Sequence, residues 1–464
     1  MLTNLTDKKL TKKDYFVISS LLFGLFFGAG NLIFPLHLGQ LAGHNWGPAV
    51  LGFLVTGVLL PLLSVLAISI TRSQGVYDIG KPLGPAFALV FMVLIHATIG
   101  PFFGTPRTAT VSFAVGLAPL LPAKSAKLAL FIFSACFFLV AYLFSRKENK
   151  IVSNVGKLLN PVFLILLTLV FFVAFLHPLG SLATATPTKE YLGNTSFING
   201  FLEGYNTMDA LAGLAFGVTV VTAVRSMGVN REAKIATVTA KSGVLGMGAV
   251  ALIYLLLTLL GVQSLGKFKL SADGGVAFSQ IVNQYAGVAG QAILATLITV
   301  TCLTTAIGLV AAFAQDFHKH FPKVSYHTWL VLSCASSFFF ANFGLETILA
   351  WSLPFLMFLY PLSMVLILLS VCSPLFKRDS AVYFFVVLFT VVPAFFDMVA
   401  TFPAVISQSS FGKAVFNFQH HYLPLANYSL SWLVPALVGL LLGLGVHYYK
   451  EFFATNTERK MERD

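Results

Sequence analysis

The chain has very little charge. Of its 464 residues, only 17 are acidic and 29 are basic, so charged residues make up 10% of the sequence, against about 25% in soluble globular domains. Hydrophobic residues make up 57%, and the mean hydropathy is +0.86. This composition excludes an ordinary soluble protein and places the chain in a lipid bilayer.

Cysteine and recognisable enzyme motifs are scarce as well. The four cysteines lie within apolar runs and lack CxxC spacing, which excludes a disulfide framework and a transition-metal site. The sequence contains no GxxxxGK[ST] loop, no HExxH and no GxSxG with plausible triad partners. It therefore predicts a protein that is not an enzyme and that needs neither a cofactor nor a nucleotide.

Long apolar runs are what the chain does have. A window of about 19 residues finds twelve candidate membrane helices. Their approximate ranges are 15–41, 48–71, 86–119, 126–145, 151–176, 201–224, 243–262, 286–314, 327–343, 345–373, 380–402 and 430–449. The connectors are too short and too rich in turn residues for a soluble domain. The predicted fold class is an all-α polytopic membrane protein with about twelve transmembrane helices.

The basic residues predict the orientation of these helices. Arg107 lies inside a predicted span. If the N-terminus is cytoplasmic, most of the other Lys and Arg residues lie on the cytoplasmic side, as the positive-inside rule requires. Six of the 29 lie outside: Lys124, Lys127, Lys189, Lys267, Lys269 and Lys413. Both termini are then cytoplasmic, and the net charge of +12 is explained by topology and anionic membrane lipid. A nucleic-acid partner is not needed.

The first span contains the sequence FGLFFGAGNLIFP at 23–35. A helix of this span's length is about 40 Å long, longer than a hydrocarbon core of about 30 Å, so it can be interrupted and still cross the membrane. Gly24, Gly28 and Gly30 lower the cost of unwinding, Asn31 can bond freed backbone groups, and Pro35 favours a new first turn. The alternative is a small-residue packing face with a proline kink.

A second interruption favours the unwound interpretation. The sixth span carries Asn206, Thr207, Asp209 and Gly213 in its outer half and middle. Five spans form the block before it, and because five is odd, the two blocks have opposite orientations, which is typical of secondary transporters. The predicted organisation is an N-terminal tail at 1–14, repeat 1 at 15–176, an extracellular loop at 177–200, repeat 2 at 201–373, helices eleven and twelve at 374–449, and a C-terminal tail at 450–464.

Four motifs also make the chain recognisable: FGAGNLIFP (27–35), IGPFFGTPRTATVSF (99–113), GYNTMDAL (204–211) and CLTTAIGL (302–309). Together, over about residues 14–445, they resemble the branched-chain amino acid:cation symporter (LIVCS) family, within the amino acid-polyamine-cation superfamily. The resemblance implies a LeuT-like fold of five plus five inverted helices in a bacterial plasma membrane. It also implies symport of leucine, isoleucine or valine with a cation.

The two interruptions provide groups that can bind both ends of a zwitterionic amino acid. Backbone N–H groups at the start of a half-helix favour a carboxylate, and the carbonyls of an unwound stretch at 207–210, with a carboxylate nearby, can accept an ammonium. The predicted substrate contacts are Gly28, Ala29, Gly30, Asn31, Thr207, Met208, Asp209 and Ala210. Asp209 and Arg107 are the ionisable residues deep in spans and are candidates for coupling. The alternative for Asp209 is a structural pairing with Arg107.

The sequence of the eighth predicted helix indicates a cation site. Thr301, Thr304 and Thr305 share one helix face, and hydroxyl and carbonyl oxygens suit Na⁺. By resemblance to sodium-coupled carriers, Thr304 and Thr305 would face the carbonyls of Gly24 and Phe27. The alternative is that these hydroxyls bond back to their own helix.

Other functions and ions are weighed against a Na⁺-coupled carrier. A channel needs a repeated filter or a ring of charges, and an enzyme needs convergent titratable groups; the chain has neither pattern. The residues leave open H⁺ in place of Na⁺, a carrier of other neutral amino acids, and a nutrient receptor that binds without translocating.

Overall fold

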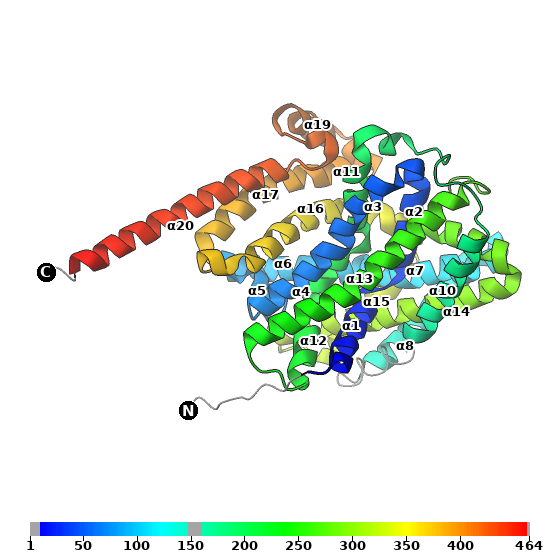
Figure 1. The fold of residues 1–464 in the computed structure, drawn as a ribbon, viewed down its shortest axis with the longest axis horizontal. Helices are drawn as coiled ribbons and strands as arrows, with labels where there is room; N and C mark the ends of the chain where they lie inside the picture. Colours follow the sequence, from blue (N-terminus) through cyan, green and yellow to red (C-terminus); the bar gives the residue numbers. More distant parts are fainter. Residues whose placement is uncertain (1–9, 147–159, 462–464) are drawn as a thin grey trace. The chain divides into compact units, whose positions relative to one another are not determined.

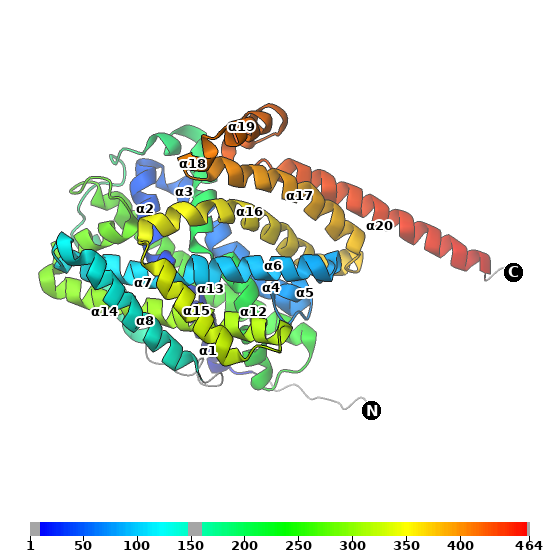
Figure 2. The same cartoon turned by 180° about the vertical axis from the view of Figure 1, so that it is seen from behind.

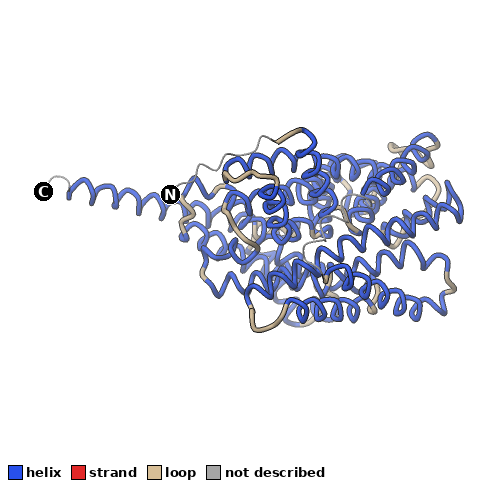
Figure 3. The backbone as a smooth tube through the Cα atoms, turned by 90° about the horizontal axis from the view of Figure 1, so that it is seen from below, coloured by secondary structure: helices blue, strands red, loops and turns tan. Residues whose placement is uncertain are grey.

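Helices are the only regular structure in the described part of the chain (Figure 3). The computed structural model describes residues 10–146 and 160–461. Outside these ranges lie most of the predicted N-terminal tail, the beginning of the predicted helix at 151–176, and the last residues of the predicted C-terminal tail. The part of that tail from 450 to Met461 belongs to a helix.

The described residues form two units. Unit 1 comprises 1–65 and 96–349, and unit 2 comprises 66–95 and 350–464. The helices wholly in unit 1 are α1 (Lys12–Phe26), α2 (Ala29–Ala42), α3 (Trp46–Leu54), α7 (Gly104–Ser112), α8 (Ala126–Ser145), α10 (Asn160–Leu176), α11 (Ser196–Glu203), α12 (Asp209–Ser226), α13 (Glu232–Ser264), α14 (Gly274–His320) and α15 (Tyr326–Ala341). Three helices have residues in both units: α4 (Leu60–Ile70), α6 (Pro85–Ala97) and α16 (Leu345–Val371).

Every predicted span overlaps one or more helices in the described residues. By length and composition, nine helical stretches within 10–146 and 160–461 can cross a membrane. Helices α1, α10 and α15, with 15, 17 and 16 residues, are shorter than the 18 residues that this count requires. The all-helical membrane architecture is therefore confirmed, and the number of twelve crossings stays a prediction.

Glycines bring the helices that carry the two interruptions close to their neighbours. Helix α2 packs on α13, as Figure 1 shows, and a Cβ at Gly39 would lie 2.0 Å from the carbonyl oxygen of Thr258. Helix α11 packs on α3 in the same way, because a Cβ at Gly200 would lie 1.9 Å from the carbonyl oxygen of Ala49. Such contacts are typical of membrane helices, where small residues allow backbones to approach.

The other side of unit 1 is built around α14, which Figure 2 shows with α8 and α15 beside it. Helix α14 is much longer than the predicted span 286–314, because it begins at Gly274. It bends at Gly287, which has a φ of 55°. Buried Val310, Ala314, Leu330 and Cys334 join α14 to α15. This packing fixes the helix that carries the predicted cation ligands.

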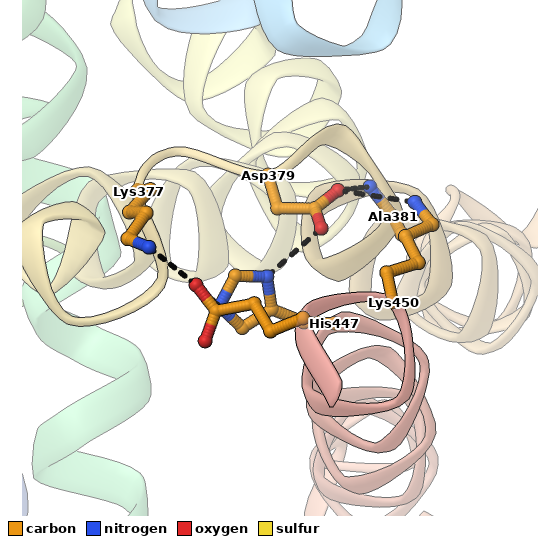
Figure 4. Close-up of polar contacts among 6 residues, drawn as sticks. Lys377, Asp379, Ala381, His447 and Lys450 are labelled. Carbon is orange, nitrogen blue, oxygen red and sulfur yellow. Dashed lines mark hydrogen bonds and ion pairs between the residues drawn. The ribbon is translucent and has the colours of Figure 1, made fainter. Parts of the chain in front are cut away.

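Unit 2 contains α5 (Val76–Gly80), α17 (Ser380–Thr401), α18 (Ala404–Ser407), α19 (Ser410–Tyr422) and α20 (Leu433–Met461). Helices α17 and α20 lie side by side. Asp379 caps α17 by accepting the Ala381 N–H at 2.9 Å, and its other oxygen is 2.9 Å from Nδ1 of His447 in α20 (Figure 4). Lys450 Nζ is 3.5 Å from the same carboxylate. A further ion pair joins Lys377, in the turn before α17, to Glu451 of α20.

We expect Asp379 to make the stability of unit 2 depend on pH. Burial alone raises the pKa of Asp379, but the Ala381 N–H, His447 and Lys450 outweigh it, so the pKa lies below its ordinary value. A carboxyl group with a lowered pKa stabilises the folded state above its unfolded pKa of about 3.9 and loses that contribution as the pH falls through the folded pKa. Thermal unfolding of wild type and Asp379→Asn from pH 7 to pH 3 should give midpoints that converge towards acid. A difference that stays constant over this range would contradict the expectation.

Candidate functional site

The first interruption separates α1 from α2. Helix α1 ends at Phe26, Phe27 and Gly28 are extended, and α2 begins at Ala29. The side chain of Asn31 accepts the Gly28 N–H at 2.9 Å, so Asn31 caps the new helix. The predicted break is present, but Pro35 lies inside α2 and not in its first turn. Capping by Asn31 explains why the helix restarts before the proline.

The second interruption separates α11 from α12. A short 3₁₀ turn, η12 (Gly204–Thr207), follows α11, and Met208 has left-handed φ and ψ of 61° and 9°. Helix α12 then begins at Asp209. The predicted unwound stretch at 207–210 was therefore too long: Asp209 and Ala210 are helical, because the single left-handed residue completes the change of direction. Such a conformation is strained for a non-glycine residue and is often found at functional sites.

One carboxylate connects the two interruptions. Asn31 Nδ2 donates to Asp209 Oδ2 at 2.6 Å, and the hydroxyl of Tyr254 in α13 donates to the same oxygen at 3.0 Å. Asn31 also donates to the Tyr254 hydroxyl oxygen. All three side chains are buried. Tyr254 was not predicted, because a tyrosine in an apolar span gives no signal of what lies opposite it.

Arg107 lies on the other side of the second interruption. Its Nη1 donates to the carbonyl oxygen of Asn206 at 2.7 Å, and its guanidinium stacks on Phe34, 5.1 Å from the ring centre. The side chain is 4% exposed and interacts electrostatically with Asp209. The alternative of an Asp209–Arg107 pairing therefore holds only in part, since the hydrogen bonds to Asp209 described above come from Asn31 and Tyr254.

A small cavity of about 40 Å³ lies between the interruptions. Eight predicted site residues line it: Gly28, Gly30, Asn31, Arg107, Thr207, Met208, Asp209 and Thr305. The remaining lining residues are absent from the predicted set: Leu25, Phe26, Ile99, Gly104, Thr108, Ala212, Phe216 and Leu309. Ile99, Gly104 and Thr108 lie in the motif at 99–113, which was a signal that could have found them. The volume holds a few waters, whereas ligand pockets span about 300–1,000 Å³.

Other predicted residues do not line the cavity. These are Gly24, Phe27, Ala210, Thr301 and Thr304, which are all buried and each lie within four residues of a lining residue in the sequence. Ala29 begins α2, and its side chain lies outside the described part of the chain.

The threonines of the predicted cation-binding face of α14 make different contacts. Thr305 lines the cavity, and a Cβ at Gly28 would lie 2.7 Å from its hydroxyl oxygen. Thr304 donates to the carbonyl oxygen of Thr301 at 2.7 Å, and Thr305 has a longer bond of 3.4 Å to the same oxygen. The back-bonding alternative thus describes Thr304 well. Thr305 also lies beside the first interruption.

Comparison with known proteins identifies the family. The sequence profile described as "Branched-chain amino acid transport protein" matches residues 11–450. The branched-chain amino acid permease BrnQ of Lactobacillus delbrueckii subsp. lactis is 44% identical over 433 residues, which cover 93% of this chain and 96% of that protein. The permease BraB of Bacillus subtilis (strain 168) is 38% identical and covers 94% of this chain and 95% of its own length. The chain belongs to this family.

The transporter is therefore a multi-pass bacterial membrane protein and not an enzyme, as the sequence predicted.

Solved structures agree on the fold. Mhp1, a nucleobase-cation-symport-1 family transporter, has a TM-score of 0.61 at 13% identity, covering 94% of this chain and 92% of its own. MhsT, solved in complex with L-phenylalanine, has a TM-score of 0.53 at 12% identity, covering 94% and 100%. At this identity the likeness shows the LeuT-like fold alone.

The contact between Gly28 and Thr305 gives a direct test of the first interruption. Gly28 has φ and ψ of −123° and −161°, which alanine can adopt. We therefore expect Gly28→Ala to destabilise the transporter by about 1–3 kcal/mol through overpacking alone. Adding Thr305→Ala should restore much of this loss, and Thr305→Ala by itself is the control. Thermal unfolding in detergent measures all three variants, and a Gly28→Ala protein as stable as wild type would refute the contact.

Proposed function

We propose that the transporter imports the branched-chain amino acids leucine, isoleucine and valine by symport with a cation, Na⁺, through alternating access. The observation that carries this proposal is the buried contact of Asn31 and Tyr254 with Asp209, which joins two interrupted helices around one cavity. Membrane helices are interrupted in this way where the freed backbone groups line a binding site. The names of the permease relatives supply the substrate class.

The architecture that we propose is the five-plus-five inverted repeat of the sequence prediction, with twelve crossings and both termini in the cytoplasm. The interrupted helices lead the two repeats, and their breaks meet at the cavity. Because the cavity is much smaller than an amino acid needs, the lining side chains have to move apart when substrate enters. Alternating access provides such a movement.

The substrate binds, in this proposal, between the start of α2 and the start of α12. The ammonium group of the amino acid lies at Asp209 and at the carbonyls of Thr207 and Met208, which end the 3₁₀ turn. The carboxylate lies at the positive end of α2. The aliphatic side chain of the substrate packs on the apolar lining: Leu25, Phe26, Ile99, Phe216 and Leu309.

Na⁺ binds, in this proposal, between α14 and the end of α1, with oxygen ligands drawn from Thr304, Thr305 and the carbonyls of Gly24 and Phe27, close to Thr301. Thr305 lies against Gly28, which directly follows Phe27 in the chain. One observation favours H⁺ as the alternative. Asp209 lines the cavity with a carboxyl group, which a proton can neutralise inside the membrane.

Uptake into proteoliposomes tests the function. We expect radiolabelled isoleucine to accumulate above its outside concentration when an inward Na⁺ gradient is imposed, and to leak out when an ionophore collapses it. Gly30→Leu is the inactive control, because even a Cβ at Gly30 would lie 3.0 Å from Phe34 and 3.2 Å from Arg107. Accumulation driven only by a pH gradient would select the H⁺ alternative. Binding without counterflow in preloaded vesicles would make the protein a receptor.

The threonine face tests the ion. Replacing Thr304 or Thr305 with valine keeps the shape of the side chain but removes one oxygen ligand. A loss of about 1.5–3 kcal/mol, typical for a hydrogen bond to a charged group, weakens the apparent Na⁺ affinity roughly 10- to 150-fold. Isoleucine affinity should fall at limiting Na⁺ and recover at saturating Na⁺, because the coupling is reciprocal.

The matched control for this test is Thr296→Val, an exposed threonine of α14 whose hydroxyl donates to the carbonyl oxygen of Ala292 at 3.0 Å. Its Na⁺ dependence should equal that of wild type. If half-saturation is unshifted in both Thr304→Val and Thr305→Val, this face of α14 does not bind the ion. Lower yields of folded protein with normal Na⁺ dependence would make the threonines structural.

A further inference from the structure

The connector between α17 and α20, residues 402–432, lies at one surface of the membrane. Both flanking helices are long and apolar enough to cross the membrane, and they pack side by side. The charged contacts of Asp379 mark the end of this pair at which α17 begins. The 22 residues of α17 extend about 33 Å, close to a hydrocarbon core of about 30 Å. The connector, which follows Thr401, therefore lies at the opposite boundary of the core.

Helix α19, within this connector, packs on the rest of unit 2 through a narrow buried stripe. The stripe consists of Gly412, Val415 and Gln419. Gln419 donates to the buried carboxylate of Asp397 in α17, and Figure 2 shows α19 beside the end of that helix. All other residues of α19 are exposed. Because the stripe fixes the rotation of the helix, it also fixes the directions of the other faces.

Aromatic side chains form both flanks of the stripe. Phe411, Phe418 and Tyr422 share one flank, and the ring centres of Phe418 and Tyr422 are 4.9 Å apart. On the other flank, Phe416 stacks on His420 with ring centres 3.9 Å apart. Exposed fractions of the three phenylalanines and the tyrosine run from 47% to 66%. Exposed apolar surface of this kind marks an interaction site, and aromatic rings are enriched where a membrane meets water.

The face opposite the stripe is polar. Lys413, Asn417 and His421 lie on it at intervals of four residues, and all three are exposed. The whole connector contains no aspartate and no glutamate. A helix with aromatic flanks and a basic polar face is suited to lie flat in the membrane interface, where lysine meets the phosphate of lipid headgroups.

We propose that α19 is an interfacial helix that binds the phospholipid surface. Its aromatic flanks enter the boundary between headgroups and acyl chains, and Lys413 contacts lipid phosphate. Lipid is the partner that fits, because the helix lies at the end of a span of membrane thickness and its exposed charge is positive. Through Gln419 and Asp397, this contact also fixes the depth of α17 in the membrane.

Fluorescence quenching in proteoliposomes of the full-length protein tests the proposal. Exposed Cys136 and Cys372 are first replaced by alanine, since the other two cysteines are buried. An environment-sensitive fluorophore is then attached to Phe411→Cys or Phe418→Cys, and Asn417→Cys on the polar face is the matched control. The ratio of quenching by brominated phospholipid to quenching by aqueous iodide should be several-fold higher at 411 and 418 than at 417.

The lipid headgroup gives a second arm. Brominated phosphatidylglycerol should quench the probe at 418 up to about fivefold more than brominated phosphatidylcholine at equal mole fraction, the enrichment that one lysine gives near an anionic surface. Adding Lys413→Gln should remove this preference and leave quenching by phosphatidylcholine unchanged. A preference that survives this change would overturn the contact between Lys413 and phosphate.

Two results would overturn the interfacial position itself. Equal quenching by iodide at 411, 417 and 418 would place α19 in water. Probes at 411 and 418 that are shielded from both quenchers would show that protein, such as a second copy of the chain, covers the flanks. Because the probes at 411 and 418 report on the same flank, either one decides the outcome if the other variant does not fold.

Discussion

The hydrogen bonds from Asn31 and Tyr254 to one oxygen of Asp209 are the interaction on which the site depends. In a membrane interior, a carboxylate and the freed backbone groups of an interrupted helix both need partners, because water does not supply them. Asn31 serves both needs: its amide nitrogen bonds Asp209, and its oxygen caps Gly28. The two interruptions therefore stabilise each other.

Close packing holds these half-helices in place. Helix α2 contacts α13 through Gly39, and α11 contacts α3 through Gly200, so each interrupted segment packs on a neighbouring helix. Tyr254 extends from the same α13 to the carboxylate, which connects the packing surface to the polar centre. A cavity of about 40 Å³ is what remains between the segments. Movement of the half-helices relative to their supports would change its size, since close-packed interfaces switch between discrete arrangements.

Unit 2 uses polar contacts differently. There Asp379 caps α17 and contacts His447 and Lys450 of α20, so that ionisable groups join the start of α17 to the middle of α20. Asp379 directly precedes the span of α17, and the side chain of Lys450 is exposed. The contrast with Asp209 is one of environment. The Asp379 carboxylate has several cationic partners, whereas the buried Asp209 carboxylate accepts hydrogen bonds from neutral donors at 2.6 and 3.0 Å.

The sequence by itself determined the all-helical membrane class, the family and the positions of both interruptions, because hydropathy, glycine, asparagine and aspartate act locally along the chain. It also indicated most of the polar residues that line the cavity. Only the tertiary structure decided that Asp209 begins a helix, that Tyr254 bonds it and that Thr305, rather than Thr304, lies at the cavity. These outcomes depend on the rotation of one helix against another and on a single left-handed residue, Met208. Neither quantity follows from the spacing of residues within one segment.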